Sequence, residues 1–160
     1  MARPSSPPSS PIPAFYRILF TIIDPLFCLL GFALHIFDPT NTLLGYSPSA
    51  RVNPAPVESQ HLLDSMAGFF LTLGLIEAVL LRVKSTDRDV WRIVQGSASM
   101  LDILMVFGAV RALSAEGRLD VGVWRGDDYR LVVGNAVAGV ARLACAAGVG
   151  MGVNGKAKKG

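Results

Sequence analysis

Four long apolar runs constrain this 160-residue chain more than any other feature. They cover Phe15–Phe37, Leu62–Leu81, Val90–Leu113 and Leu131–Val153. Each run has about the 20 residues that an α-helix needs to cross roughly 30 Å of hydrocarbon. The sequence therefore predicts an all-α polytopic membrane protein, with a four-helix transmembrane bundle within residues 14–153. The expected helices span about residues 15–37, 62–82, 91–113 and 131–153.

A water-soluble bundle with long buried helices is the main alternative. Helices of such a bundle would show polar side chains on nearly every turn, but the segment GFFLTLGLIEAVLL does not. Only 17% of the residues are charged, whereas an average soluble domain has about a quarter. Both observations favour the membrane.

The segments outside the runs have a different composition. Residues 1–13 are rich in proline and serine, which predicts a disordered N-terminal tail, and residues 154–160 form a short basic C-terminal tail. The net charge is +3, but the basic residues lie mostly at the ends of the runs and are not interleaved with aromatic residues. Nucleic acid is therefore not an expected partner. The expected partner is the lipid bilayer, and an oligomer is left open.

The distribution of basic residues predicts an orientation. With four spans, both ends of the chain lie on one side of the membrane. That side would carry Arg3, Arg17, Arg82, Lys84, Arg88, Arg92, Lys156, Lys158 and Lys159, and the other side Arg51, Arg111, Arg118, Arg125 and Arg130. Because the cytoplasmic side of a membrane protein carries more lysine and arginine, we expect both termini in the cytoplasm. The sequence does not indicate which membrane it is.

Each run also carries an ionisable residue near its centre, namely Asp24, Glu77, Asp102 or Arg142. With a rise of ~1.5 Å per residue, Asp24 lies roughly 3 Å and Glu77 roughly 8 Å from the midplane. Asp102 and Arg142 lie at about the midplane. Since charged groups in hydrocarbon are costly and usually face the bundle interior, we expect these four side chains to form one buried polar layer.

Other polar residues recur at helical spacing beside this layer. In the first run, spacings of four and three place one stripe along the helix: Arg17, Thr21, Asp24, Cys28, Gly31 and His35. Gln95 lies seven residues before Asp102, and Asn135 seven before Arg142, so each pair shares a helix face. We expect Gln95 and Asn135 to support the layer. His35 is expected to be a hydrogen-bonded or interfacial residue.

Pro25 directly follows Asp24 in the first run. Because proline has no backbone N–H, it leaves the carbonyl of Thr21 without its helical partner and predicts a kink. A transmembrane helix tolerates such a proline where neighbouring groups satisfy the freed carbonyl. A kink beside a carboxyl group can also open a small cavity.

The layer has two interpretations. In the first, Arg142 neutralises carboxylates, and the resulting ion-pair network fixes how the helices or a partner pack. In the second, Asp24, Glu77 and Asp102 are catalytic carboxyls of a cofactor-free isomerase or cyclase acting on a lipophilic, sterol- or terpenoid-like molecule. Three acids face one arginine, so at least one is expected to be protonated, as a general acid requires. A small transporter is a weaker alternative. No metal or cofactor motif is present, so neither is expected.

Several stretches resemble a family of small fungal four-helix membrane proteins, domain-of-unknown-function family 7704. They are PAFYRILFTIIDP, LHIFDPT, LLDSMAGFFLTLGLIEAVLLR, DVWR, MLDILMVFGAVRAL and GRLDVGVWRGDDY. The two Asp-Pro pairs, at Asp24–Pro25 and Asp38–Pro39, are the most specific of these cues. The resemblance implies a fungal source and an integral membrane location, and it supplies no activity, substrate or catalytic residue.

Overall fold

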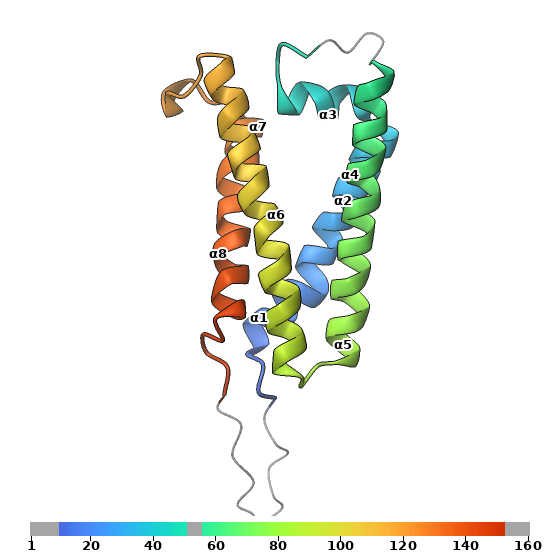
Figure 1. The fold of residues 1–160 in the computed structure, drawn as a ribbon, viewed down its shortest axis with the longest axis vertical. Coiled ribbons are helices and arrows are strands. Elements are labelled where there is room, and N and C mark those ends of the chain that lie inside the picture. Colours follow the sequence, from blue (N-terminus) through green and yellow to red (C-terminus); the bar gives the residue numbers. More distant parts are fainter. Residues whose placement is uncertain (1–9, 51–55, 153–160) are drawn as a thin grey trace, which may run out of the picture.

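The computed structural model describes residues 10–50 and 56–152, and within these ranges every regular element is helical. Of the expected N-terminal tail, residues 1–13, the first nine lie outside the described residues, and Ile12 is buried. The basic tail 154–160 also lies outside the described residues. Four long helical stretches run along the molecule (Figure 1). In chain order, their segments are α1 (Ala14–Ile18), η1 (Leu19–Ile23) and α2 (Asp24–Phe37); α4 (Val57–Leu75), η2 (Ile76–Leu80) and α5 (Leu81–Val83); α6 (Arg88–Ala115); and α7 (Gly126–Tyr129), η4 (Arg130–Gly134) and α8 (Asn135–Ala146).

Two shorter elements lie in the connections. The short helix α3 (Pro39–Tyr46) follows the first stretch, and a single 3-10 turn, η3 (Val121–Val123), lies between the third and the fourth. Helix α3 begins at Pro39, where a missing backbone N–H costs nothing because the first turn of a helix has no partner for it. Figure 1 shows α3 crossing the end of the molecule away from both described chain ends.

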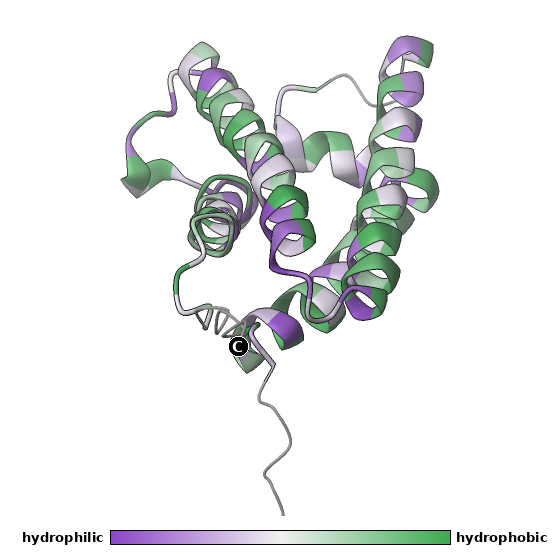
Figure 2. Cartoon of the chain, turned by 60° about the horizontal axis from the view of Figure 1, so that its bottom comes forward, coloured by the Kyte–Doolittle hydropathy of each residue, from purple (hydrophilic) through white to green (hydrophobic). Residues whose placement is uncertain are grey.

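Three stretches are long and apolar enough to cross a membrane: Ala14–Phe37, Val57–Val83 and Arg88–Ala115, with 24, 27 and 28 residues. Large apolar side chains cover their outer surfaces, including Phe27 at 65% exposure and Phe107 at 63%. Figure 2 shows these helices as mostly hydrophobic. A soluble protein rarely exposes so much apolar surface, whereas a bilayer covers it. The prediction of an all-helical fold with helices able to span a membrane is confirmed, and the four-helix transmembrane bundle remains a prediction.

The fourth helical stretch, which corresponds to the span expected at residues 131–153, is not among these three candidate spans. It is interrupted by Arg130, Asn135 and Arg142, which lower its mean hydropathy. The helix also lies earlier in the chain than residues 131–153, because it begins at Gly126 and ends at Ala146. Gly148 and Gly150 follow with φ angles of 79° and 73°, a left-handed backbone that glycine adopts readily and that ends the helix.

The other helices also extend beyond their expected bounds. The second stretch begins at Val57 instead of residue 62, because the segment VESQH continues the helix with polar residues beyond the apolar run. The third covers Arg88–Ala115 instead of residues 91–113, and Asp87 caps its first turn by accepting a hydrogen bond from the N–H of Val90. Hydropathy therefore located the apolar centres, while polar residues outside the apolar runs, such as the cap Asp87, extend the helices beyond them.

The helices pack as two antiparallel pairs, the first stretch with the second and the third with the fourth (Figure 1). Small residues allow each close approach. A Cβ atom added at Gly74 would lie 2.9 Å from Cys28 Cβ in the first pair, and one added at Gly139 would lie 3.1 Å from Asp102 Cβ in the second. Such contacts are typical of helix pairs in membranes, where small residues let the backbones approach.

An apolar core joins the two pairs at the end that carries both described chain ends. It consists of Ile12, Tyr16, Phe20, Leu81, Trp91, Cys145 and Met151. The backbone N–H of Gly152 donates to the carbonyl of Pro11 at 3.2 Å, so the two ends lie side by side. Trp91 is fully buried, and its indole N–H donates to the carbonyl of Lys84 at 3.0 Å, which fixes the turn between α5 and α6.

Candidate functional site

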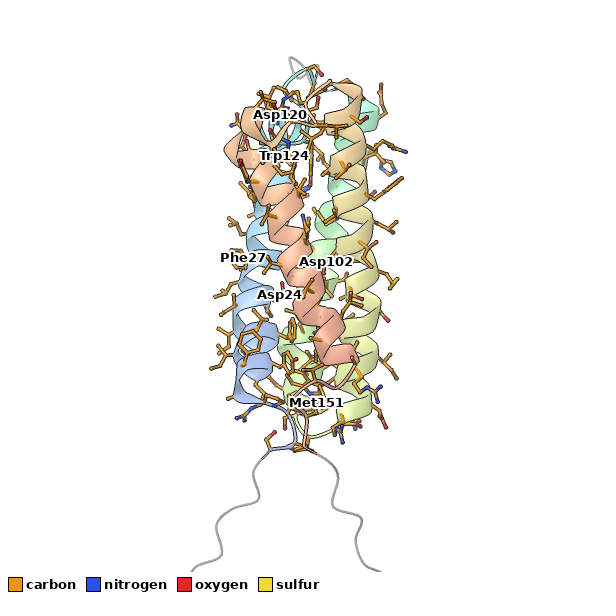
Figure 3. The ribbon with its side chains drawn as sticks, turned by 90° about the vertical axis from the view of Figure 1, so that its left-hand side faces the viewer. Asp24, Phe27, Asp102, Asp120, Trp124 and Met151 are labelled. Carbon is orange, nitrogen blue, oxygen red and sulfur yellow. The ribbon has the colours of Figure 1, made fainter. Side chains whose placement is uncertain are left out.

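The four ionisable residues predicted to share one layer meet in the structure. Asp24 begins α2, Glu77 lies in η2, Asp102 in the middle of α6 and Arg142 in α8. Figure 3 shows Asp24 and Asp102 at similar heights, about midway along the bundle. Each of the four helical stretches therefore contributes one charged or chargeable group to a single buried cluster.

Arg142 is the centre of this cluster. Its Nη1 lies 2.9 Å from both carboxylate oxygens of Asp102. Its Nη2 donates to Oδ2 of Asp24 and lies 3.6 Å from Oε1 of Glu77. Only 3% of the Arg142 side chain is exposed, so a single desolvated guanidinium contacts an acid from each of the other three stretches.

Gln95 extends the cluster along α6. Its side-chain N–H donates to Oε1 of Glu77 at 3.0 Å, and both side chains are fully buried. Three atoms of the cluster have no hydrogen-bond partner among the described residues: Glu77 Oε2, Gln95 Oε1 and Arg142 Nε. Because unpaired buried polar atoms are costly, these positions are where a proton, a water molecule or a polar ligand group would stabilise the cluster most.

The charges of the cluster do not balance when every group is ionised, because three carboxyl groups surround one guanidinium. A net negative charge inside a bilayer is costly and is removed by binding a proton or a cation. One oxygen from Asp24, one from Glu77 and the thiol sulfur of Cys28 lie within 4.8 Å of one another, which is close enough for shared metal ligands. However, Asp24 already pairs with Arg142, and a guanidinium at this position repels a divalent ion. A proton is therefore the better counter-charge.

Two π-helical segments position the acids. In η1, the N–H of Asp24 donates to the carbonyl of Leu19, five residues earlier, just before Pro25. The carbonyl of Thr21, which has no partner at Pro25, accepts a hydrogen bond from Arg82 Nη2 at 2.6 Å. Glu77 lies within the second π-helical segment, η2. Such segments often occur at functional positions because their extra residue changes the direction of the side chains.

Two of the predicted supporting residues lie away from the cluster. The ring of His35 contacts the carbonyl of Gly31 at 2.7 Å and the hydroxyl of Tyr46 at 2.8 Å, which joins α2 to α3. The side-chain N–H of Asn135 donates to the carbonyl of Leu131 at 2.6 Å, one turn earlier in its own helix. Each side chain contacts a backbone carbonyl one turn earlier in its own helix, His35 also contacts Tyr46, and neither bonds to a carboxyl group of the layer.

A second polar cluster, at the end that carries α3, was not predicted. Asp128 accepts from Arg118 and from Arg125, the latter at 3.0 Å, and Arg125 Nη1 also donates to the carbonyl of Leu44 at 2.9 Å. Burial alone would raise the pKa of Asp128, but the hydrogen bonds from Arg125 and Arg118 lower it below its usual value. The alternating charges of the segment RLDVGVWRGDD were the only signal for this cluster, and they do not specify a contact with α3.

Glu116 links the same cluster to the segment after α3. One carboxylate oxygen accepts hydrogen bonds from Ser47 and, at 2.9 Å, from Ser49, and the other pairs with Arg118 at 3.0 Å. The hydrogen bond from Ser47 is the main reason why the pKa of Glu116 is lowered. Hydrogen bonds to the charged side chains of Glu116 and Arg125 therefore connect the segment around α3 to the segment between α6 and α8.

A family model described as "Domain of unknown function (DUF7704)" matches residues 9–152, which is nearly the whole chain. The chain belongs to this family. The match includes the cluster around Arg142, called the midplane cluster below (Asp24, Glu77, Gln95, Asp102 and Arg142), and the cluster around Asp128. Both therefore lie within the DUF7704 domain. No curated protein and no solved structure matches the chain.

Proposed function

We propose that this DUF7704 protein, from a fungal source, crosses the membrane four times with both termini in the cytoplasm. The support for the fourth span is the position of Arg142. It pairs with Asp24 and Asp102, which lie near the middle of two apolar stretches, so the helix that carries Arg142 lies at the same depth. The excess of basic residues at the end of the molecule with both termini supports the orientation.

The proposed role of the midplane cluster is to fix the packing of the helices in a membrane protein that is not an enzyme. The observation that carries this proposal is the contact of one guanidinium with carboxyl groups from three other helices. A buried ion pair adds little net stability, but it penalises any rotation that separates the charges. The cluster would thus select one arrangement of the bundle, or of its interface with a partner.

Acid–base chemistry on a lipophilic molecule is the second candidate function. It is favoured by Oε2 of Glu77 and Oε1 of Gln95, which have no hydrogen-bond partner among the described residues and belong to two fully buried side chains in contact with each other. A neutral carboxyl group beside an ionised one can donate a proton to an apolar substrate. Asp24, Glu77 and Asp102 would be the groups that transfer the proton.

Replacing Asp24 by asparagine separates the two candidates. The amide keeps the volume and can still accept a hydrogen bond from Arg142. Under the packing role, an Asp24→Asn protein reaches normal abundance in the membrane and complements a deletion strain. Under the catalytic role, it is equally abundant and fails to complement. Glu77→Gln is the matched test at the acid with the unpartnered oxygen.

Labelling of single cysteines tests the topology. Cys28 and Cys145 are buried free thiols, so the unmodified chain serves as the background. A cysteine at Ser85 should react with an impermeant reagent only after the cytoplasmic side is opened, and one at Ser49 only from the other side. Labelling of both positions from the same side would contradict the proposed topology.

A further inference from the structure

A groove lies on the outer side of the contact between the first and second helical stretches. Its volume is about 310 Å³, which falls within the range of small-molecule sites. Its walls are almost entirely apolar and include Leu29 and Phe70. It forms because Pro25, Gly74 and Ala78 are small, and they leave space where larger side chains would fill the seam between the helices.

Arg82 closes the end of this groove that points toward the chain termini. One of its N–H groups donates to the carbonyl of Thr21, which Pro25 leaves without a helical partner. This contact holds the guanidinium against the groove. Four further N–H donors of the same group remain available.

No acid in the described part of the chain neutralises this arginine. Within residues 10–50 and 56–152, no carboxylate lies within ion-pair distance of Arg82, and none lies within that distance of Arg17, one helical turn before Thr21. Both side chains are exposed. A hydrophobic groove thus ends at a cationic group that is held by a hydrogen bond and has no counter-ion among the residues that the structure describes.

We propose that this groove binds one acyl chain of an anionic phospholipid, with Arg82 on the phosphate of a headgroup whose net negative charge, unlike that of phosphatidylcholine, is not cancelled by a trimethylammonium group. The apolar walls fit a hydrocarbon chain, and the planar guanidinium fits a phosphate. A neutral lipophile or an apolar helix of a second copy would leave the charge of Arg82 unpaired. Anionic lipids are concentrated in the cytoplasmic leaflet, and only this choice of leaflet rests on the proposed orientation.

The test measures lipid binding by the purified full chain in a neutral detergent. Phosphatidylserine and phosphatidylcholine with the same oleoyl chains are titrated, and the thermal midpoint is followed. Phosphatidylserine should raise the midpoint at a lower concentration than phosphatidylcholine, with an apparent affinity about fivefold tighter. This factor is what one arginine near an anionic lipid contributes. Equal effects of the two lipids would overturn the proposal, as would a larger effect of a neutral sterol.

Arg82→Gln keeps a donor for the Thr21 carbonyl and removes the charge, so it should abolish the preference for phosphatidylserine. Arg82→Lys should retain much of it. Arg111→Gln is the matched control, because Arg111 is also exposed and lies at the opposite end of the bundle. A preference that survives Arg82→Gln, or one that disappears in Arg111→Gln, would refute the assignment of the headgroup.

Ala78→Phe fills the groove and should weaken binding of both lipids. Val79→Phe is its control, because Val79 is 57% exposed and does not line the groove. If Ala78→Phe does not fold, as judged by gel filtration without added lipid, the Arg82 variants decide the proposal. Unchanged lipid binding by a folded Ala78→Phe protein would exclude the groove as the site of the acyl chain.

Discussion

The Nη1 atom of Arg142 lies 2.9 Å from each carboxylate oxygen of Asp102, and this contact joins α8 to α6 inside the bundle. The second terminal nitrogen of the same guanidinium faces the first two helical stretches, through Asp24 and Glu77. Asp102 therefore holds Arg142 within its own helix pair, while Asp24 and Glu77 connect it to the other pair.

Removing Arg142 should destabilise the protein strongly. Arg142→Leu leaves the buried Glu77 and Asp102 and the partly buried Asp24 without this cation, and loss of one partner of a buried ion pair costs about 3–5 kcal/mol. Asp102→Leu alone should also destabilise, because it removes the acid that pairs with Arg142 within its own helix pair. The double variant should lose less stability than the sum of the losses in the two single variants, because both partners of one ion pair are removed together. Thermal unfolding in detergent gives the three values, and strict additivity would show that the residues are not coupled.

The contact between Gly74 and Cys28 should not tolerate a methyl group. In Gly74→Ala the new Cβ would lie 2.9 Å from Cys28 Cβ, so the helices would have to separate, at a cost of about 1–3 kcal/mol. Gly68→Ala is the control on the same helix, because nothing lies within 4 Å of its added Cβ. Replacing Cys28 by glycine in the Gly74→Ala background should restore stability. An unchanged unfolding midpoint in Gly74→Ala would show that the two helices leave room for a methyl group between Gly74 and Cys28.

Acid should weaken the cluster at the α3 end. Since hydrogen bonds from Ser47 and Ser49 lower the pKa of Glu116 below its ordinary value of 4.5, the ionised form is the one that the folded state favours. Its contribution is therefore complete above about pH 4.5 and is lost as the pH falls through the lower folded-state pKa. Glu116→Gln should lower the unfolding midpoint at neutral pH, reduce its pH dependence below pH 4.5, and change the midpoint little at still lower pH, where Glu116 of the natural chain is protonated. A steeper acid dependence in the variant would contradict this assignment.

Pro25 and Arg82 should be energetically coupled. In Pro25→Ala the restored N–H can donate to the carbonyl of Thr21, so the hydrogen bond from Arg82 is no longer needed there. Arg82→Ala should then cost about 1 kcal/mol less in the Pro25→Ala background than in the natural chain, which is the net value of one hydrogen bond. A double-mutant cycle of detergent unfolding measures the difference. Equal costs in both backgrounds would mean that Thr21 does not depend on Arg82.

Helical periodicity accounts for most of the site that the sequence predicted. Spacings of three, four and seven placed Asp24, Gln95 and Asp102 on inward faces, and the structure brings them together with Glu77 and Arg142. The catalytic role of these acids stays a prediction. Periodicity does not exclude local bonding, which is why Asn135 shared the face of Arg142 and yet bonds to its own helix.

The remaining features depend on contacts between distant segments. The hydrogen bond from Arg82 to Thr21 joins residues 61 positions apart, and the one from Arg125 to Leu44 joins residues 81 apart. Hydropathy and spacing report on a single helix at a time and contain no information on such pairs. The π-helical segments were missed for a related reason, since Glu77 lies in one without any proline to signal it.

The pairing of Asp24 with Arg142 has a consequence for biosynthesis. The two residues are 118 positions apart, and ribosomes add about 5–20 residues per second. Arg142 is therefore synthesised roughly 6–24 s after Asp24. During this interval the first helix holds Asp24 in the bilayer without its cation, or it stays near the interface or beside the insertion machinery. Tyr16 and Phe20 likewise lack their core partners Cys145 and Met151 until those residues have been synthesised. Ribosomes stalled before residue 142 should therefore hold a first helix that is more accessible to chaperones and proteases than the same helix in the finished protein.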